Sequence, residues 1–152
     1  MRATKTKKEE DHGRDQAIAQ INSICEMVER LEHCRECKDP DCGIDLGKSS
    51  MTSGEYHDED AALQAIQDDP LEISIRSDWY HPGEDAEPTE FNILLCTGGP
   101  ACRILGDLDE HKQPSRAYIQ HQDWFKPWTE LILESWQYKA LLTYCQQFYF
   151  GD

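Results

Sequence analysis

The spacing of apolar residues changes twice along this chain, and this change constrains the fold more than any other feature. Near the N-terminus they recur at steps of three and four, as on one face of a helix, at Ala17, Ile21, Ile24, Val28 and Leu31. From residue 71 to residue 76 apolar and polar residues alternate, which predicts a strand with one buried face. The helical spacing returns near the C-terminus, at Leu133, Trp136, Ala140, Leu141, Tyr144 and Phe148. These two periods predict an α+β fold in which helices cover one face of a sheet.

The predicted strands follow one another closely. After 71–76, strands are expected over 90–97, 101–108 and 115–122. Connections this short join antiparallel neighbours, so the sequence predicts a four-stranded antiparallel β-meander. Helices are expected to pack on it, over 14–32, about 58–67 and about 129–150.

The length of 152 residues fits a single domain with additional segments. No apolar run approaches the ~20 residues of a membrane span, and no apolar segment follows the basic N-terminus as in a secretory signal. We therefore expect a protein of the host cytoplasm that does not contact membranes. The expected organisation is a disordered tail (1–13), an N-terminal helix (14–32), a Cys-containing loop or linker (33–56) and an α+β domain (57–152).

Negative charge is concentrated in one part of the chain. The net charge is −15, and residues 55–90 hold twelve acids against one base, Arg76. Direct nucleic-acid binding is disfavoured, because phosphate contacts need Lys and Arg. A carboxylate-dense surface could instead occupy the basic groove of a nucleic-acid-binding protein, although such a face can also serve solubility alone.

The residues expected to contact such a partner are eight acids and two aromatic anchors. The acids supply long-range attraction, and the aromatic side chains supply apolar contact area. The set consists of Asp58, Glu59, Asp60, Asp68, Asp69, Glu84, Asp85 and Glu87, with Trp79 and Tyr80 as the anchors.

A cysteine cluster offers a different kind of site. Cys34 and Cys37 have the C-x2-C spacing that can bind one zinc ion, and Cys42 could supply a third sulfur. The fourth ligand would be His33, His57 or an Asp of the same loop. The alternative interpretation is three incidental thiols on a polar segment.

No catalytic signature stands out. The sequence contains no G-x-S-x-G, H-E-x-x-H, P-loop or dinucleotide-binding pattern. His121 lies on the predicted inner face of its strand, where a hydrogen-bonded core histidine is expected. We therefore expect a protein that is not an enzyme.

Three stretches resemble a family of small proteins carried by phages, prophages and plasmids. They are ILLCTGGPACRI (93–104), QDWFKPWTE (122–130) and LTYCQQFYFG (142–151), and the resemblance covers residues 60–152. The family has no assigned activity, so no site residue follows from it. Its genomic context implies small acidic inhibitors of host nucleases, including anti-CRISPR and anti-restriction proteins.

These observations lead to two functional hypotheses. The first is a non-enzymatic inhibitor that binds a basic nucleic-acid-handling host protein, such as a nuclease or CRISPR effector subunit, through a DNA-mimicking acidic face. The second is a zinc-stabilised interaction or regulatory module built on Cys34, Cys37 and Cys42. In either case the helix over 14–32 could pack on the domain or pair with a second copy to form a homodimer.

Overall fold

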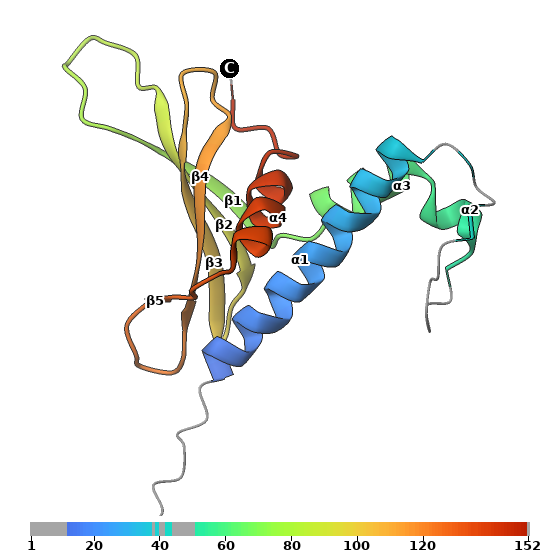
Figure 1. Cartoon of the computed structure of the whole chain (residues 1–152). Helices are drawn as coiled ribbons and strands as arrows, with labels where there is room; N and C mark the ends of the chain where they lie inside the picture. Colours follow the sequence, from blue (N-terminus) through green and yellow to red (C-terminus); the bar gives the residue numbers. More distant parts are fainter. Residues whose placement is uncertain (1–11, 38, 40–41, 44–50, 152) are drawn as a thin grey trace, which may run out of the picture.

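The structure is a computed structural model that describes residues 12–37, 39, 42–43 and 51–151 (Figure 1). Within these residues no helix is long and apolar enough to cross a membrane. The elements in chain order are α1 (His12–Glu36), α2 (Ser53–Tyr56), α3 (Glu59–Gln67), β1 (Glu72–Ser77), β2 (Pro88–Cys96), β3 (Ala101–Leu108), β4 (Pro114–Gln122), β5 (Thr129–Glu130) and α4 (Ser135–Cys145).

The sheet confirms the predicted α+β class and the antiparallel meander, but it has five strands instead of four. Their order is β1-β2-β3-β4-β5, and each strand pairs antiparallel with the next. The additional strand β5 consists of residues that we expected to begin the C-terminal helix. Its pairing with β4 continues past its end, because Leu131 N–H donates to the Ile119 carbonyl at 2.9 Å. The C-terminal helix therefore begins later than predicted, at Ser135, and it ends at Cys145 instead of near Phe150.

Helix α1 packs against β3 and β4, and α4 packs against β4 and α1, on one face of the sheet (Figure 1). The predicted stripe of α1 is buried, and the helix is longer than the predicted 14–32 at both ends. Of the predicted tail, residues 12 and 13 belong to this helix and 1–11 lie outside the described residues. The stripe that a second copy could have covered is thus occupied by the chain's own core. That core also contains Ile66, Phe91, Ile93, Ile104, Ile119, Leu141 and Tyr144.

The predicted loop at 33–56 contains helical structure at both ends. The last turn of α1 extends to Glu36, and α2 begins with a capping box between Thr52 and Glu55. Residues 38, 40–41 and 44–50 of this segment lie outside the described residues. The short acidic helix occurs where expected, with Asp58 as its N-cap.

Strand β1 differs most from the prediction. Ile73 opposes Ile93 and Ile75 opposes Phe91, so both isoleucines point to the face of the sheet that carries the core. They are nevertheless 36% and 50% exposed, and Leu71 is 61% exposed. The helices lie over β3 and β4, so the expected burial of one face of β1 is wrong.

Gly106 on β3 marks the tightest approach within the sheet, and it allows a specific prediction. A Cβ at this position would lie 2.1 Å from the Arg116 carbonyl oxygen and 2.4 Å from the Phe91 ring. Gly106→Ala should therefore force neighbouring backbone apart and lower the free energy of unfolding by about 1–3 kcal/mol in urea titrations.

Gly54→Ala is the matched control, because the nearest atom to a Cβ there is Thr52 Oγ1 at 4.0 Å. It should change stability by no more than about 0.5 kcal/mol. Equal urea midpoints for the two variants would contradict the described packing of β3 on β4.

Candidate metal centre

Two histidines and two cysteines converge where α1 ends and α2 ends. His33 lies in the last turn of α1, Cys37 follows that helix, Cys42 lies in the described segment 42–43, and His57 is the C-cap of α2. One ligand atom from each of these residues lies within 4.8 Å of the others. The set contains two imidazole nitrogens and two thiol sulfurs, which is a donor set typical of zinc.

The separations among three of the four ligand atoms approach those of a tetrahedral zinc site. His33 Nε2 and His57 Nε2 are 2.9 Å apart, and Cys42 Sγ lies 3.1 Å from His57 Nε2 and 3.5 Å from His33 Nε2. Zinc–ligand bonds of 2.0–2.3 Å in a tetrahedron separate the ligand atoms by about 3.3–3.8 Å. Shifts of a few tenths of an ångström would bring these three atoms to tetrahedral separations, whereas the Cys37 thiol, within 4.8 Å of them, would have to approach by up to about 1 Å.

The local sequence explains why the first two ligands share one side of α1. His33 and Cys37 are four residues apart, so they lie one helical turn from each other. The Cys37 N–H donates to the His33 carbonyl at 2.7 Å, which continues the helical hydrogen bonding to Cys37. Because the buried stripe of α1 fixes the rotation of the helix, it also fixes the direction in which this pair points.

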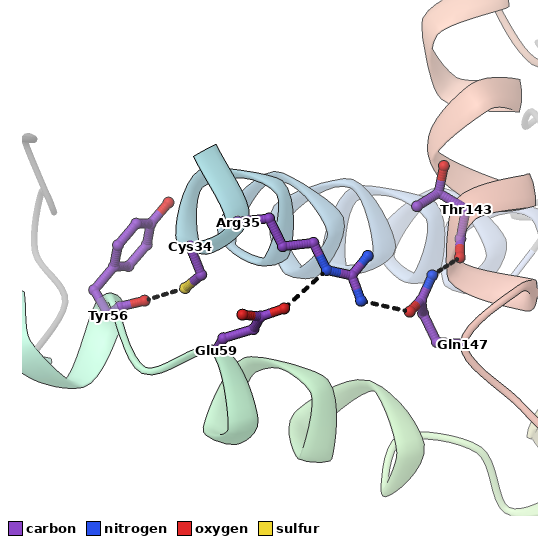
Figure 2. A network of polar contacts seen from close by, with 6 residues as sticks. All are labelled: Cys34, Arg35, Tyr56, Glu59, Thr143 and Gln147. Atoms are coloured by element: carbon purple, nitrogen blue, oxygen red, sulfur yellow. Dashed lines mark hydrogen bonds and ion pairs between the residues drawn. The ribbon is translucent and has the colours of Figure 1, made fainter. Parts of the chain in front are cut away.

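Helix α2 brings His57 to this pair through hydrogen bonds to its backbone. Arg30 donates to the Glu55 carbonyl at 2.8 Å and to the Tyr56 carbonyl at 3.3 Å. The Cys34 thiol donates to the Tyr56 carbonyl at 2.9 Å (Figure 2). These bonds satisfy carbonyl groups at the end of a short helix and hold that end against α1.

The imidazole of His57 is oriented for coordination. Its Nδ1 lies 2.5 Å from the Ser53 carbonyl oxygen, which can only accept, so Nδ1 carries the proton. In the neutral ring this tautomer has its lone pair on Nε2, the nitrogen that faces His33 and Cys42. Metal-binding histidines commonly have their second nitrogen fixed in this way by a carbonyl or carboxylate.

Three of the predicted ligands belong to this cluster, and Cys34 does not. Its side chain is 3% exposed and joins the apolar core. It lies three residues after Leu31, so it continues the apolar spacing of α1. The sequence therefore already indicated that Cys34 would be buried. His57, one of the three candidates for the fourth position, takes the place that Cys34 was expected to fill.

The other buried thiols are unsuited to nucleophilic or ligand roles. Burial raises the pKa of Cys102 to about 12 and also raises the pKa of the fully buried Cys145. Both are therefore protonated near neutral pH, whereas the thiolate is the form that binds metal or attacks. His121 is buried, as expected for a core histidine.

The acids predicted to form one face fall into two separate groups. Several carboxylates in and next to α3 are used within the chain: Asp58 caps α3 by accepting from Ala61 N–H at 3.1 Å, and Asp69 accepts from the Tyr144 hydroxyl at 2.7 Å. Glu59 pairs with Arg35 at 3.1 Å, and the Arg35 guanidinium also donates to Gln147 (Figure 2). Asp68 accepts from Gln64, whereas Asp60 is exposed in the first turn of α3.

The second group lies in the loop between β1 and β2, which we term the 78–87 loop. It carries Glu84, Asp85 and Glu87 together with Trp79 and Tyr80, whose exposed fractions are 103% and 54%. In Figure 1 this loop projects from one end of the sheet, whereas α3 lies on the opposite side of the molecule. The ten predicted contact residues therefore do not form one continuous surface.

The chain matches no protein-family model, no curated protein and no solved structure. The resemblance to proteins of mobile elements thus stays an expectation from the sequence.

The cluster predicts that protein purified without added metal or chelator contains about one zinc ion per chain. Cys37→Ser and His57→Ala should each reduce this to well below one, as measured by elemental mass spectrometry. Replacement by Co²⁺ should produce the absorption bands of a tetrahedral site with two thiolate ligands.

Cys34→Ser is the matched control, because its sulfur faces the Tyr56 carbonyl and the core. It should retain the zinc even where the melting temperature falls. Loss of zinc in Cys34→Ser with retention in His57→Ala would show that a different ligand set binds the metal.

Proposed function

We propose that this chain is a non-catalytic interaction module in which a zinc ion fastens α2 and Cys42 to the end of α1. The observation that carries this proposal is the convergence of His33, Cys37, Cys42 and His57 within 4.8 Å. Four protein ligands complete a tetrahedral shell, which is typical of structural zinc sites, whereas catalytic sites keep a position for water.

The composition of α2 supports a structural role for the metal. None of its four residues is buried, so burial of apolar side chains contributes little to its position. Its hydrogen bonds to Arg30 and Cys34 hold one end, and coordination by His57 would add a much stronger constraint. No residue of α2 belongs to the buried core.

Chelation should therefore loosen α2 and leave the sheet intact. In hydrogen–deuterium exchange, removal of zinc should speed exchange at Tyr56 and His57, whose N–H groups bond to Thr52 and Ser53. Peptides from β2, β3 and β4 should exchange at nearly unchanged rates. Collapse of protection across the whole sheet would instead mean that the metal supports the core.

A second proposal concerns how the chain meets a partner. We propose that the 78–87 loop binds a basic nucleic-acid-handling protein, such as a host nuclease or CRISPR effector subunit, in competition with nucleic acid. Trp79 is fully exposed in the same loop as four acids, which favours this proposal. These acids are Asp78, Glu84, Asp85 and Glu87. An exposed Trp within an acidic loop offers apolar contact area where the acids attract a cationic surface.

A charge-reversal comparison tests this proposal. Changing Glu84, Asp85 and Glu87 to Lys should reduce capture of such a protein from host lysate by more than about tenfold, since long-range attraction and contact are both lost. Duplex DNA and high salt should release the protein captured by the unaltered chain.

The control changes Asp60, Glu110 and Glu130 to Lys, three exposed acids outside this loop. It changes the net charge by the same amount as the loop variant and should still capture the partner protein. If both triple variants lose the partner to the same degree, total charge and not the 78–87 loop governs the interaction.

A further inference from the structure

Strand β1 forms an open edge of the sheet and carries exposed apolar side chains. It lies at the end of the strand order and pairs only with β2 within the described residues. Leu71, Ile73 and Ile75 extend the core-bearing face beyond the area that α1 and α4 cover, and they stay 36–61% exposed. A strand with free backbone groups and an uncovered apolar face is a site for pairing with another strand.

This edge has little of the protection that isolated edge strands usually carry. Proline and inward-pointing charges commonly block such edges, and the stretch from Glu72 to Arg76 contains neither. Its two charged residues, Glu72 and Arg76, lie on the opposite face from the isoleucines. A register irregularity occurs only at the end, between Arg76 and Ser77.

The sequence of β1 is complementary to itself in antiparallel pairing. When two copies meet about a two-fold axis at Ser74, Glu72 of one copy lies opposite Arg76 of the other, and the reverse holds. On the other face Ile73 lies opposite Ile75 of the second copy. Opposite charges and β-branched residues are both favourable cross-strand pairs.

We propose that two copies of this chain associate through β1 in this register and form one continuous ten-stranded sheet. The occupant of the open edge is thus a second copy, selected by the Glu72–Arg76 and Ile73–Ile75 pairs. Arg76 already contacts Glu90 on β2. In the dimer its guanidinium lies between Glu90 of its own chain and Glu72 of the other copy.

The arrangement has a consequence for the 78–87 loop. This loop follows β1, so antiparallel pairing puts the two loops of the dimer at opposite ends of the joined sheet. Two basic surfaces, or two sites on one oligomeric partner, could then be bound simultaneously. The interface uses none of the metal-centre residues and is independent of the zinc.

One strand per copy makes a small interface, so a reversible monomer–dimer equilibrium is expected. Sedimentation equilibrium of the full chain at about 0.5 M NaCl, which screens the repulsion between two acidic chains, should give a Kd below about 0.5 mM. A strictly monomeric mass up to that concentration would overturn the proposal.

Charge exchange tests the register. Glu72→Arg sets two arginines opposite each other across the interface, and Arg76→Glu sets two glutamates opposite each other, so each variant alone should dimerise at least about tenfold more weakly. In a mixture of the two variants, each cross-strand pair between positions 72 and 76 joins an arginine of one variant to a glutamate of the other. The mixture should therefore form a heterodimer, identified by its mass in native mass spectrometry. Glu110→Arg, with the same charge change as Glu72→Arg, should dimerise as the unaltered chain does.

Arg76→Glu also faces Glu90 within its own chain and can weaken the β1–β2 pairing. The double variant Glu72→Arg/Arg76→Glu is a second test of the register. It again sets an arginine opposite a glutamate across the interface, so it should dimerise more strongly than Glu72→Arg. Unchanged dimerisation of Glu72→Arg, or no recovery in either the mixture or the double variant, would overturn the proposed register.

Discussion

The structure depends above all on the burial of one face of α1 against the sheet and α4. Ala17, Ile21, Ile24 and Leu31 are almost completely excluded from water, and this burial fixes the rotation of a 25-residue helix. The N-terminal end is fixed as well: the His12 N–H donates to Asp123, and Gly13 lies so close to the Gln122 backbone that a Cβ would meet its oxygen at 2.6 Å. The opposite end then carries two of the candidate metal ligands, His33 and Cys37, in a defined direction.

The acidic composition has more than one physical use in this chain. Around α3 the carboxylates cap a helix, pair with Arg35 and accept from Tyr144, so they stabilise the connection between α1, α3 and α4. Burial and the hydrogen bond to Asp69 both raise the pKa of Tyr144, which keeps its hydroxyl as the donor. In the 78–87 loop the carboxylates surround an exposed Trp instead. The charge excess is therefore divided between internal contacts and one exposed loop.

Much of the fold followed from local patterns, and the differences have identifiable causes. The alternation and short connections predicted the meander, because strand pairing over short loops is a local property. Strand β5 was missed because only two residues carry it, and its pairing is set by β4. Three residues of the candidate metal centre, His33, Cys37 and Cys42, were predicted from their types and spacing. Cys34 lies outside the cluster because it continues the apolar stripe of α1, a position that the C-x2-C pattern outweighed in the prediction.

The sequence by itself determined the positions of α1, α3 and strands β1 to β4 and the apolar stripe of α1, since periodicity depends only on neighbours along the chain. Tertiary structure decided which apolar faces become covered: α1 buries its stripe, whereas β1 lies beyond the helices and leaves Ile73 and Ile75 exposed. It also decided that His57 meets His33 across 24 residues of chain. This contact depends on how α1 and α2 pack in three dimensions, which local spacing does not encode.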